Sequence, residues 1–255
     1  MVKSFSDRLK CVSHPKAQEL INIILRKKSN LCFSADVTES QKLLELVDKV
    51  GPHICLLKTH IDIVSDFTPD LVTELRKLAK KYDFLIFEDR KFADLGNTVQ
   101  KQFSEGIYKI SSWADFINAH VVVGPGIITG LKNVAHNQGL ILIAQMSAAG
   151  NLCHQAYIKE ALRMAEDNRS FVCGFICTES VTSDESFLNF VPGVNFSSSG
   201  DGLGQQFVSP SQAVQKGADV IIVGRGIYQS SNPAETAKEY KELAYTAYLN
   251  LLESE

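Results

Sequence analysis

The sequence predicts an α/β protein: a single (β/α)8 TIM barrel over residues 1–255, with extra helices at its N-terminus. Eight short apolar segments alternate with segments of helical pattern, and strands buried on both faces of a parallel sheet have such continuous apolar sequences. A doubly wound open sheet would show a similar alternation. No Gly-x-Gly-x-x-Gly follows the first strand, where a dinucleotide-binding sheet has one. The barrel is therefore the predicted fold.

The expected elements follow one another in a regular order. Residues 3–28 should form two helical pieces separated at His14-Pro15, the second with an apolar face. The expected strands are 31–36, 53–58, 84–89, 115–123, 140–146, 171–177, 190–194 and 219–223. The helices after them are expected near 38–49, 71–80, 98–104, 126–136, 156–167, 184–188, 211–215 and 233–252. The Gly/Ser-rich stretch 196–206 suits a mobile lid over a ligand.

Composition excludes several classes of partner. The chain is 45% hydrophobic and 22% charged with a net charge of −3, which gives no reason to expect nucleic acid or anionic membrane as a partner. No apolar run approaches the ~20 residues of a membrane span, and the first residues lack the apolar core of a signal peptide. The six cysteines are scattered without a Cys-x-x-Cys motif. We therefore expect a soluble, cytoplasmic protein with reduced thiols.

Charged residues follow three consecutive strands. Asp36 ends the first, Lys58 the second, and Asp89 with Lys91 the third, while Asp94 comes where the next helix begins. Asp89 and Lys91 are two residues apart, so on an extended backbone they point to the same side. In a barrel the carboxyl ends of the strands meet at one rim, where active sites are built. Four charges of alternating sign at that rim indicate a functional network.

The expected chemistry of this network is proton donation. A lysine among carboxylates keeps its proton, so Lys58 and Lys91 are poor Schiff-base nucleophiles and suited to stabilise developing negative charge. Asp89 and Asp94 could instead bind a hard cation, since carboxylates are its preferred ligands. Two lysines in the same cluster argue against that use. We therefore expect no metal.

A second group of residues suits a phosphorylated ring compound. Gly224-Arg225-Gly226 follows the eighth strand, and backbone N–H groups with a guanidinium at a strand-to-helix turn are suited to phosphate. The loops after strands seven and eight are where barrel enzymes often hold phosphate. Met146-Ser147 ends the fifth strand with an apolar wall and a hydroxyl that could bind a ring edge.

These residues carry a family resemblance. Asp89-x-Lys91-x-x-Asp94, with Lys58-Thr59-His60 before it and Gly224-Arg225-Gly226 after it, resembles the orotidine 5′-phosphate decarboxylase family in its eukaryotic form. The resemblance implies decarboxylation of orotidine 5′-phosphate to uridine 5′-phosphate and CO2, the last step of UMP synthesis, with no cofactor. Lys91 would protonate C6 and Asp89 would lie beside the substrate carboxylate. Asp36 and Lys58 would complete the charged array.

The resemblance also implies a homodimer and a set of substrate contacts. Asp94 would reach the active site of the other subunit, joined by Thr98. Ser34 and His60 would hold the nucleoside, and Ser147 would bind the pyrimidine edge. The full set of implied contacts is Ser34, His60, Thr98, Met146, Ser147, Pro192, Gln205, Gly224 and Arg225.

Two positions depart from the family pattern, and two other functions stay open. Phe207 stands where a tyrosine is usual, which predicts weaker substrate binding, and Gln145 stands where glutamate is expected. The first alternative is a Mg-dependent sugar-phosphate decarboxylase or hexulose-phosphate synthase of the same superfamily. The second is a non-catalytic nucleotide-binding barrel. The chain could be a whole protein or the decarboxylase domain of a bifunctional UMP synthase.

Overall fold

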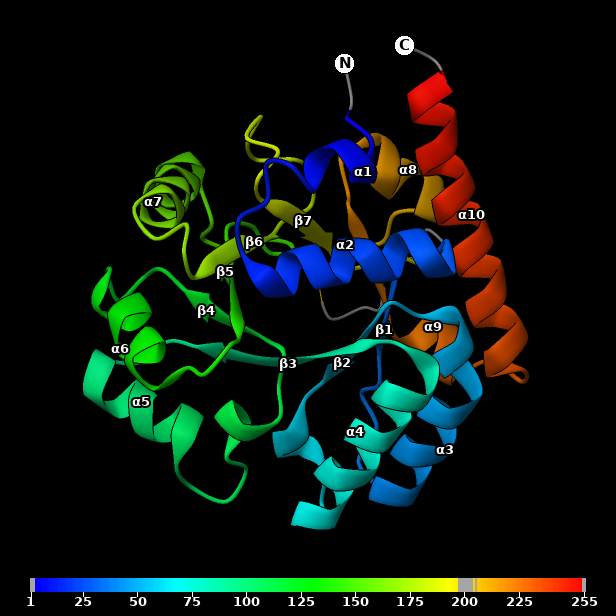
Figure 1. Ribbon diagram of the computed structural model, residues 1–255, viewed down its shortest axis with the longest axis horizontal. Helices are drawn as coiled ribbons and strands as arrows, with labels where there is room; N and C mark the ends of the chain where they lie inside the picture. The colour runs from blue at the N-terminus through cyan, green and yellow to red at the C-terminus, as the bar shows by residue number, and fades with distance from the viewer. Residues whose placement is uncertain (1–2, 197–203, 205, 254–255) are drawn as a thin grey trace.

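The computed structural model describes residues 3–196, 204 and 206–253, and its sheet is a closed parallel barrel with strand order β1 to β8 (Figure 1). β8 pairs with β1 through Cys32 and Ile222, which closes the ring. The strands are β1 Leu31–Ser34, β2 Leu56–Thr59, β3 Leu85–Phe92, β4 Phe116–His120, β5 Gly139–Ile143, β6 Val172–Ile176, β7 Leu188–Val191 and β8 Val220–Val223. The predicted barrel is thus confirmed.

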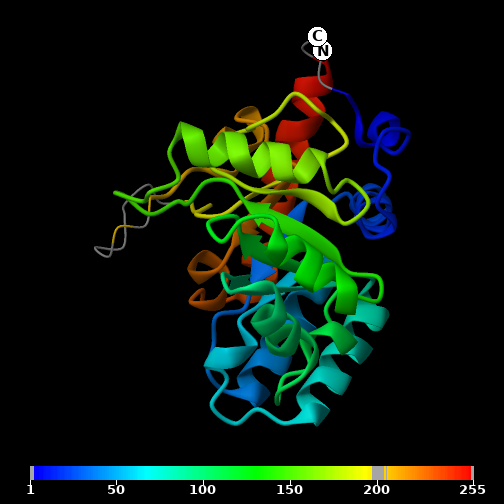
Figure 2. The same cartoon turned by 90° about the vertical axis from the view of Figure 1, so that its left-hand side faces the viewer.

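Helices surround the barrel, and most lie where the sequence predicts them (Figures 1 and 2). They are α1 Phe5–Arg8, α2 Pro15–Lys27, α3 Ser40–Val50, α4 Pro69–Tyr82, α5 Gly96–Ser104, α6 Gly126–Val134, α7 Gln155–Glu166, α8 Pro210–Gln215, α9 Arg225–Tyr228 and α10 Pro233–Glu253. Short 3-10 turns cover Gly51–His53, Ile61–Ile63 and Ile110–Ser112. The end of α10 packs against the start of α1, where the Tyr248 hydroxyl accepts a hydrogen bond from the Phe5 N–H (Figure 2).

Three local predictions were wrong. The expected helix at 184–188 is a turn in which the Asp184 carboxylate accepts hydrogen bonds from the Ser186 N–H and hydroxyl. Polar side chains that bond their own backbone favour turns over helices. Leu188, the last residue of the predicted helix, already belongs to β7. Most strands are shorter than the apolar runs predicted for them. The four-residue helix α9 was not foreseen. Most of the predicted lid lies outside the described residues.

Close packing of two helices sets the position of the loop after β3. A Cβ at Gly130 in α6 would lie 2.5 Å from the Gly96 carbonyl oxygen of α5, so the two backbones touch at these glycines. Only a residue without a side chain permits this approach. α5 follows Asp94 and carries Thr98, and its contact with α6 therefore fixes both residues on the barrel rim.

No helix in the part of the chain that the structure describes is long and apolar enough to cross a membrane.

Candidate active site

Four charged side chains meet at the carboxyl-terminal rim, as the sequence predicts. Lys58 Nζ lies 2.9 Å from Asp89 Oδ2 and 3.3 Å from Asp36 Oδ1. Lys91 Nζ lies 2.7 Å from Asp89 Oδ1. The Ser34 hydroxyl donates to Asp36 Oδ1 at 2.8 Å. Asp89 is therefore held between two ammonium groups that come from neighbouring strands.

Asp89 and Lys91 reach one another through an irregular strand. β3 pairs with β4 at Glu88–Ile117 and next at Phe92–Ala119, so the three residues 89–91 stand against Asn118 alone. Lys91 has a φ of 49°, in the left-handed region that a non-glycine residue adopts mainly at functional or strained positions. The two side chains meet as expected, but by a bulge and not by regular alternation.

The charges in the array support one another. Burial alone would raise the pKa of Asp89, but Lys58 and Lys91 hold this pKa far below its usual range. Burial would likewise lower the pKa of Lys58, but the carboxylates of Asp89 and Asp36 raise it. At neutral pH both side chains are charged, and the expectation that Lys58 keeps its proton agrees with this direction.

His60 extends the array on the side of β2. Burial and the nearby Lys58 ammonium lower the pKa of His60, so its imidazole is neutral at pH 7. Its Nε2 lies 2.8 Å from Lys58 Nζ, which makes it an acceptor for that ammonium. His60 thus orients Lys58 through a direct hydrogen bond.

Glu88 lies behind the array and was not singled out in the sequence. It is completely buried and accepts hydrogen bonds from the Thr59 hydroxyl at 2.6 Å and the Ile61 N–H at 3.0 Å. Burial raises its pKa to about 8, although these two donors act in the opposite direction. Glu88 therefore holds the Thr59 side chain and the Ile61 backbone, the residues on either side of His60. The alternation of a strand, which places Glu88 opposite Asp89, is the sequence signal that could have found it.

A cavity of about 270 Å³ opens beside the array. It is lined by eight polar or charged residues and by glycines and apolar residues from most of the strand ends. They are Ser34, Asp36, Lys58, Asp89, Lys91, Met146, Ser147, Ile176, Pro192, Gly193, Val194, Asn195, Phe207, Ile222, Gly224, Arg225 and Gly226. The charged array thus occupies one part of a pocket whose lining includes most of the expected substrate contacts.

The glycine–arginine turn after β8 forms another part of this pocket. Gly224 lies beside the end of β1, where a Cβ would be in ordinary contact, 3.4 Å, with the Ser34 Cβ. The Arg225 guanidinium lies over the Phe207 ring, 5.3 Å from its centre, a cation–π distance. The role of Phe207 in holding Arg225 was missed, because the sequence does not show that the two residues meet.

Three expected contacts lie outside the pocket, and a fourth lies outside the described residues. His60 contacts the array through Lys58, on the side of β2. Asp94 is half-buried and accepts hydrogen bonds from the Leu95 N–H and the Gln102 amide, while Thr98 is exposed on α5. Neither reaches the pocket of its own chain. Gln205 is the residue outside the described part of the chain.

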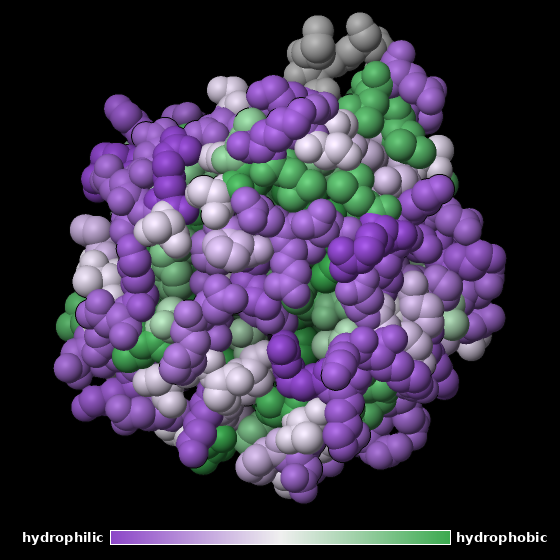
Figure 3. Space-filling model, in the orientation of Figure 1, coloured by the Kyte–Doolittle hydropathy of each residue, from purple (hydrophilic) through white to green (hydrophobic). Residues whose placement is uncertain are grey.

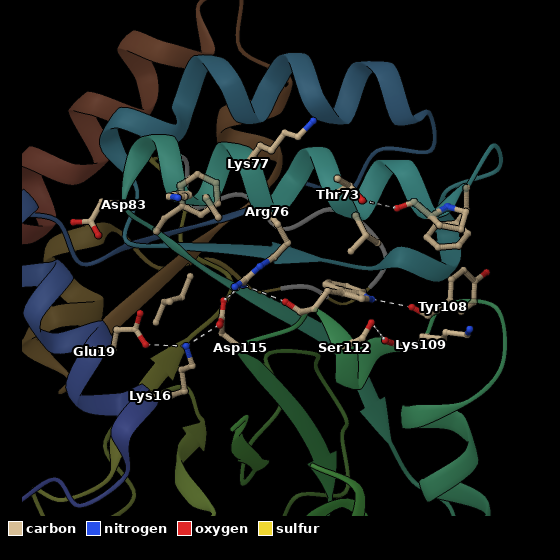
Figure 4. A pocket seen from close by; sticks show the side chains of 18 of the residues that line it. Lys16, Glu19, Thr73, Arg76, Lys77, Asp83, Tyr108, Lys109, Ser112 and Asp115 are labelled. Atoms are coloured by element: carbon tan, nitrogen blue, oxygen red, sulfur yellow. Dashed lines mark hydrogen bonds and ion pairs between the residues drawn. The ribbon is translucent and has the colours of Figure 1, made fainter. Parts of the chain in front are cut away.

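A larger cavity, of about 920 Å³, lies at the opposite end of the barrel between α2, α4 and the start of β3 (Figure 4). Its floor is the buried Asp115 carboxylate, which pairs with Lys16 Nζ at 3.0 Å and Arg76 Nη1 at 2.8 Å. The face that α2 crosses is mainly hydrophilic (Figure 3). Because these charges are paired with one another, the arrangement fits a structural ion cluster. It lies at the amino-terminal ends of the strands, the face of a barrel that contributes to stability and not to catalysis.

Comparison with known proteins places this geometry in a family. Residues 29–240 match the model of the orotidine 5′-phosphate decarboxylase / HUMPS family. The chain is 50% identical over 255 residues to orotidine 5′-phosphate decarboxylase of Rhizomucor pusillus, covering 97% of this chain and 96% of that protein. It is also 50% identical over 243 residues to uridine 5′-monophosphate synthase of Bos taurus, covering 94% of this chain but only 51% of that longer protein.

Solved structures agree in fold. Orotidine 5′-monophosphate decarboxylase of Methanocaldococcus jannaschii, complexed with the inhibitor BMP, superposes with a TM-score of 0.67 at 23% identity. The match covers 84% of this chain and 97% of that one. At this identity the superposition supports the barrel fold alone, and the family assignment rests on the sequence match. By that match, the chain belongs to the orotidine 5′-phosphate decarboxylase / HUMPS family.

Proposed function

We propose that this protein is a carboxy-lyase that converts orotidine 5′-phosphate to uridine 5′-phosphate and CO2 without a metal or other cofactor. The observation that carries the proposal is the Asp89 carboxylate held between Lys58 and Lys91 on the wall of the pocket. The relatives that match over nearly their whole length bear the name of this activity.

The reaction needs a proton at the carbon that loses CO2. As the C6–carboxylate bond breaks, its electron pair stays on C6 and CO2 leaves. The Lys91 ammonium then donates a proton to C6, and solvent returns a proton to the amine. A general acid of this kind is effective when it is held in place, and the hydrogen bond to Asp89 at 2.7 Å holds the Lys91 side chain.

The other pocket residues are proposed to hold the nucleotide. Arg225 and the Gly224 turn suit the phosphate, and Ser147 with Met146 suits the pyrimidine ring, since all four line the same cavity as the array. Pro192 would close the ring site, and Ser34 with His60 would fix the ribose side through Asp36 and Lys58. Gln205 is proposed as a further phosphate contact. Binding energy gathered far from C6 can thereby serve the chemical step.

The charge array favours this reaction over a Mg-dependent one on sugar phosphates. In the described residues both oxygens of Asp89 already face ammonium groups, and Asn118 donates a third bond to the carboxylate. A divalent cation at Asp89 would have to displace these positive charges. The donor set around Asp89 therefore suits an organic substrate that is negatively charged.

A homodimer is proposed because the rim of the barrel carries exposed apolar residues beside Asp94 and Thr98. Leu95, Val122 and Leu152 are 69%, 71% and 80% exposed and lie in the loops after β3, β4 and β5. These loops are adjacent in the closed barrel. Large apolar side chains exposed on one rim are typical of an interface. Asp94 and Thr98 would then enter the site of the partner subunit.

The cytoplasm is the proposed location, since all six cysteines are free and four of them are buried.

The deciding experiment follows the loss of orotidine 5′-phosphate absorbance with purified protein in EDTA. We expect turnover by the wild-type protein and a loss of about 10³-fold or more in Lys91→Ala, in the range of general-acid catalysis. Lys10→Ala, which removes an exposed lysine, is the matched control. Turnover only with Mg²⁺ and a sugar phosphate would move the protein to the sister activity. Tight binding of uridine 5′-phosphate without turnover would make it a binding protein.

A further inference from the structure

Asn118 is a completely buried residue of β4. Its side-chain amide forms hydrogen bonds with both Asp89 and Lys91 of β3, the two residues proposed to act at C6. Its Nδ2 donates to Asp89 Oδ1 at 2.6 Å, and its Oδ1 accepts from the Lys91 N–H at 2.7 Å. The bond to Asp89 is shorter than an ordinary N–H···O bond, and the bond from Lys91 lies at the short end of the ordinary range. One side chain thus contacts a carboxylate and a backbone amide that lie two residues apart.

The bulge in β3 explains why a side chain is needed here. Between Glu88 and Phe92 the ladder to β4 is interrupted, so the Lys91 N–H has lost the β4 carbonyl that a regular strand would offer. A backbone N–H that is left unpaired in a protein interior is unfavourable. The Asn118 amide takes the place of the missing ladder bond. It also holds the left-handed backbone of Lys91, whose φ is 49°.

The chemistry of the two neighbours allows only one orientation of the amide. Lys91 presents an N–H, which can only donate, so the atom facing it must be the amide oxygen. Asp89 is ionised, because Lys58 and Lys91 hold the pKa of its carboxyl far below the usual range. The atom facing it must then be the amide nitrogen. An asparagine meets both demands, whereas an ionised aspartate lacks the donor and a leucine of similar size lacks both groups.

We propose that Asn118 is a positioning residue for the decarboxylation: it fixes the Asp89 carboxylate and the Lys91 backbone in the geometry that aims the Lys91 ammonium into the pocket. This inference rests on the proposed function and goes beyond it, since Asn118 does not line the pocket and would not touch the substrate. Its effect is exerted through Asp89 and Lys91.

A charged replacement gives the inference a distinctive test. In Asn118→Asp, the oxygen that accepts from Lys91 is kept, but the donor to Asp89 becomes a second carboxylate oxygen. The charged and titratable groups near this position are Asp89 and Lys91 from β3, Lys58 and His60 from β2 and His120 from β4. β5 contributes only Gly139–Ile143, which has no titratable side chain. The Lys58 and Lys91 ammonium groups are already paired with Asp89, at 2.9 and 2.7 Å, and would act on the new carboxyl less than its own burial and the neighbouring Asp89 charge. We therefore expect the pKa of the new carboxyl to be raised.

Below that raised pKa, the neutral acid of Asn118→Asp donates to Asp89 as the wild-type amide does. Above it, two carboxylates repel one another. We expect the ratio of the kcat of Asn118→Asp to the wild-type kcat to rise about tenfold or more between pH 8.5 and pH 5.5. A residue that serves only the stability of the barrel would give a ratio independent of pH.

The experiment measures kcat, KM and uridine 5′-phosphate affinity for the wild-type protein, Asn118→Ala and Asn118→Asp. Asn118→Ala should lose about 100-fold in kcat, the effect of misplacing a reacting group by about 1 Å, with KM and nucleotide affinity within about threefold of wild type. Asn189→Ala is the matched control, because Asn189 is a buried asparagine of β7 outside the pocket. It should keep kcat within about threefold.

Two results would overturn the inference: wild-type kcat in Asn118→Ala, or a pH-independent ratio for Asn118→Asp. Should Asn118→Ala fail to fold, the pH series on a single preparation of Asn118→Asp decides alone. Failure of the proposed function looks different, since the wild-type protein itself would then show no turnover of orotidine 5′-phosphate.

Discussion

Lys58 Nζ lies 2.9 Å from Asp89 Oδ2, and both side chains are almost wholly removed from solvent. Taking two charges out of water carries a desolvation penalty that their attraction often fails to repay, and apolar replacements of buried ion pairs are frequently neutral or stabilising. The pair is therefore poorly explained by stability. Its position on the pocket wall and its contact with Lys91 through Asp89 are better explained by the chemistry proposed for the site.

Replacing Lys58 should show how much its ion pairs contribute to the stability of the fold. Lys58→Met keeps the apolar stem but leaves Asp36 and Asp89 without their shared cation, so we expect a loss of about 3 kcal/mol in unfolding free energy at pH 7. The folded-state pKa values of both carboxyls are lowered in the wild type, so their contribution is present above the unfolded pKa of ~3.9 and is lost as the pH falls through the folded values. Urea denaturation at pH 7 and pH 3 measures this.

The deficit of Lys58→Met should accordingly shrink at pH 3. Lys10→Met, at an exposed pair with Asp7, is the control and should change little at either pH. An equal deficit for Lys58→Met at both pH values would show that lost packing, and not lost charge, is responsible.

The contribution of Glu88 to the free energy of unfolding should have the opposite pH dependence. Its pKa is raised to about 8 by burial, so the folded protein binds a proton that the unfolded chain has released above pH ~4.5. Its stabilising contribution is complete at low pH and is lost as the pH rises towards 8. Glu88→Gln removes this titration, so the variant should gain about 1–3 kcal/mol relative to wild type between pH 5 and pH 8.5.

Thermal or urea unfolding across this pH range tests the Glu88 prediction. Glu74→Gln, at an exposed pair with Lys77 on α4, provides a glutamate control without burial. A difference between Glu88→Gln and wild type that stays constant with pH would mean that Glu88 is ionised throughout.

Replacing Phe207 with tyrosine tests whether one added hydrogen bond improves kcat/KM. It lines the pocket beneath Arg225, where a tyrosine hydroxyl would add one donor close to the proposed phosphate. One neutral hydrogen bond contributes about 0.5–1.5 kcal/mol net, so Phe207→Tyr should raise kcat/KM by roughly 2- to 12-fold, chiefly through KM. Steady-state kinetics with orotidine 5′-phosphate measure the change. Phe207→Leu, which loses the cation–π contact with Arg225, should lower the same ratio, and unchanged values in both variants would contradict the interpretation.

Subunit mixing tests the proposed role of Asp94. Lys91→Ala and Asp94→Ala homodimers should each be nearly inactive. When the two variants are mixed in equal amounts and exchange subunits, roughly half of the dimers become heterodimers. Each heterodimer has one intact site of two, so we expect recovery of roughly 25% of wild-type activity. Mass spectrometry confirms the exchange. Heterodimers without recovered activity would place Asp94 in the site of its own chain, and an active Asp94→Ala homodimer would place it outside the site.

Much of the fold could be predicted because its signals are local. Apolar segments of strand length, helical periodicity and the absence of a dinucleotide fingerprint depend on residues near in sequence. The charged strand ends could also be predicted to meet, since a parallel barrel brings all carboxyl ends to one rim. Asp36, Lys58, Asp89 and Lys91 do meet there.

The tertiary structure alone decided how these residues are held. The bulge at 89–91 depends on the register between β3 and β4, which residues distant in sequence determine together. Asn118 and the Arg225–Phe207 contact became visible only once that register and the closed barrel were known. By itself the sequence therefore determined which chemical groups reach the rim. Their precise geometry is a property of packing between elements, because no local pattern of residues encodes which neighbour a buried side chain will meet.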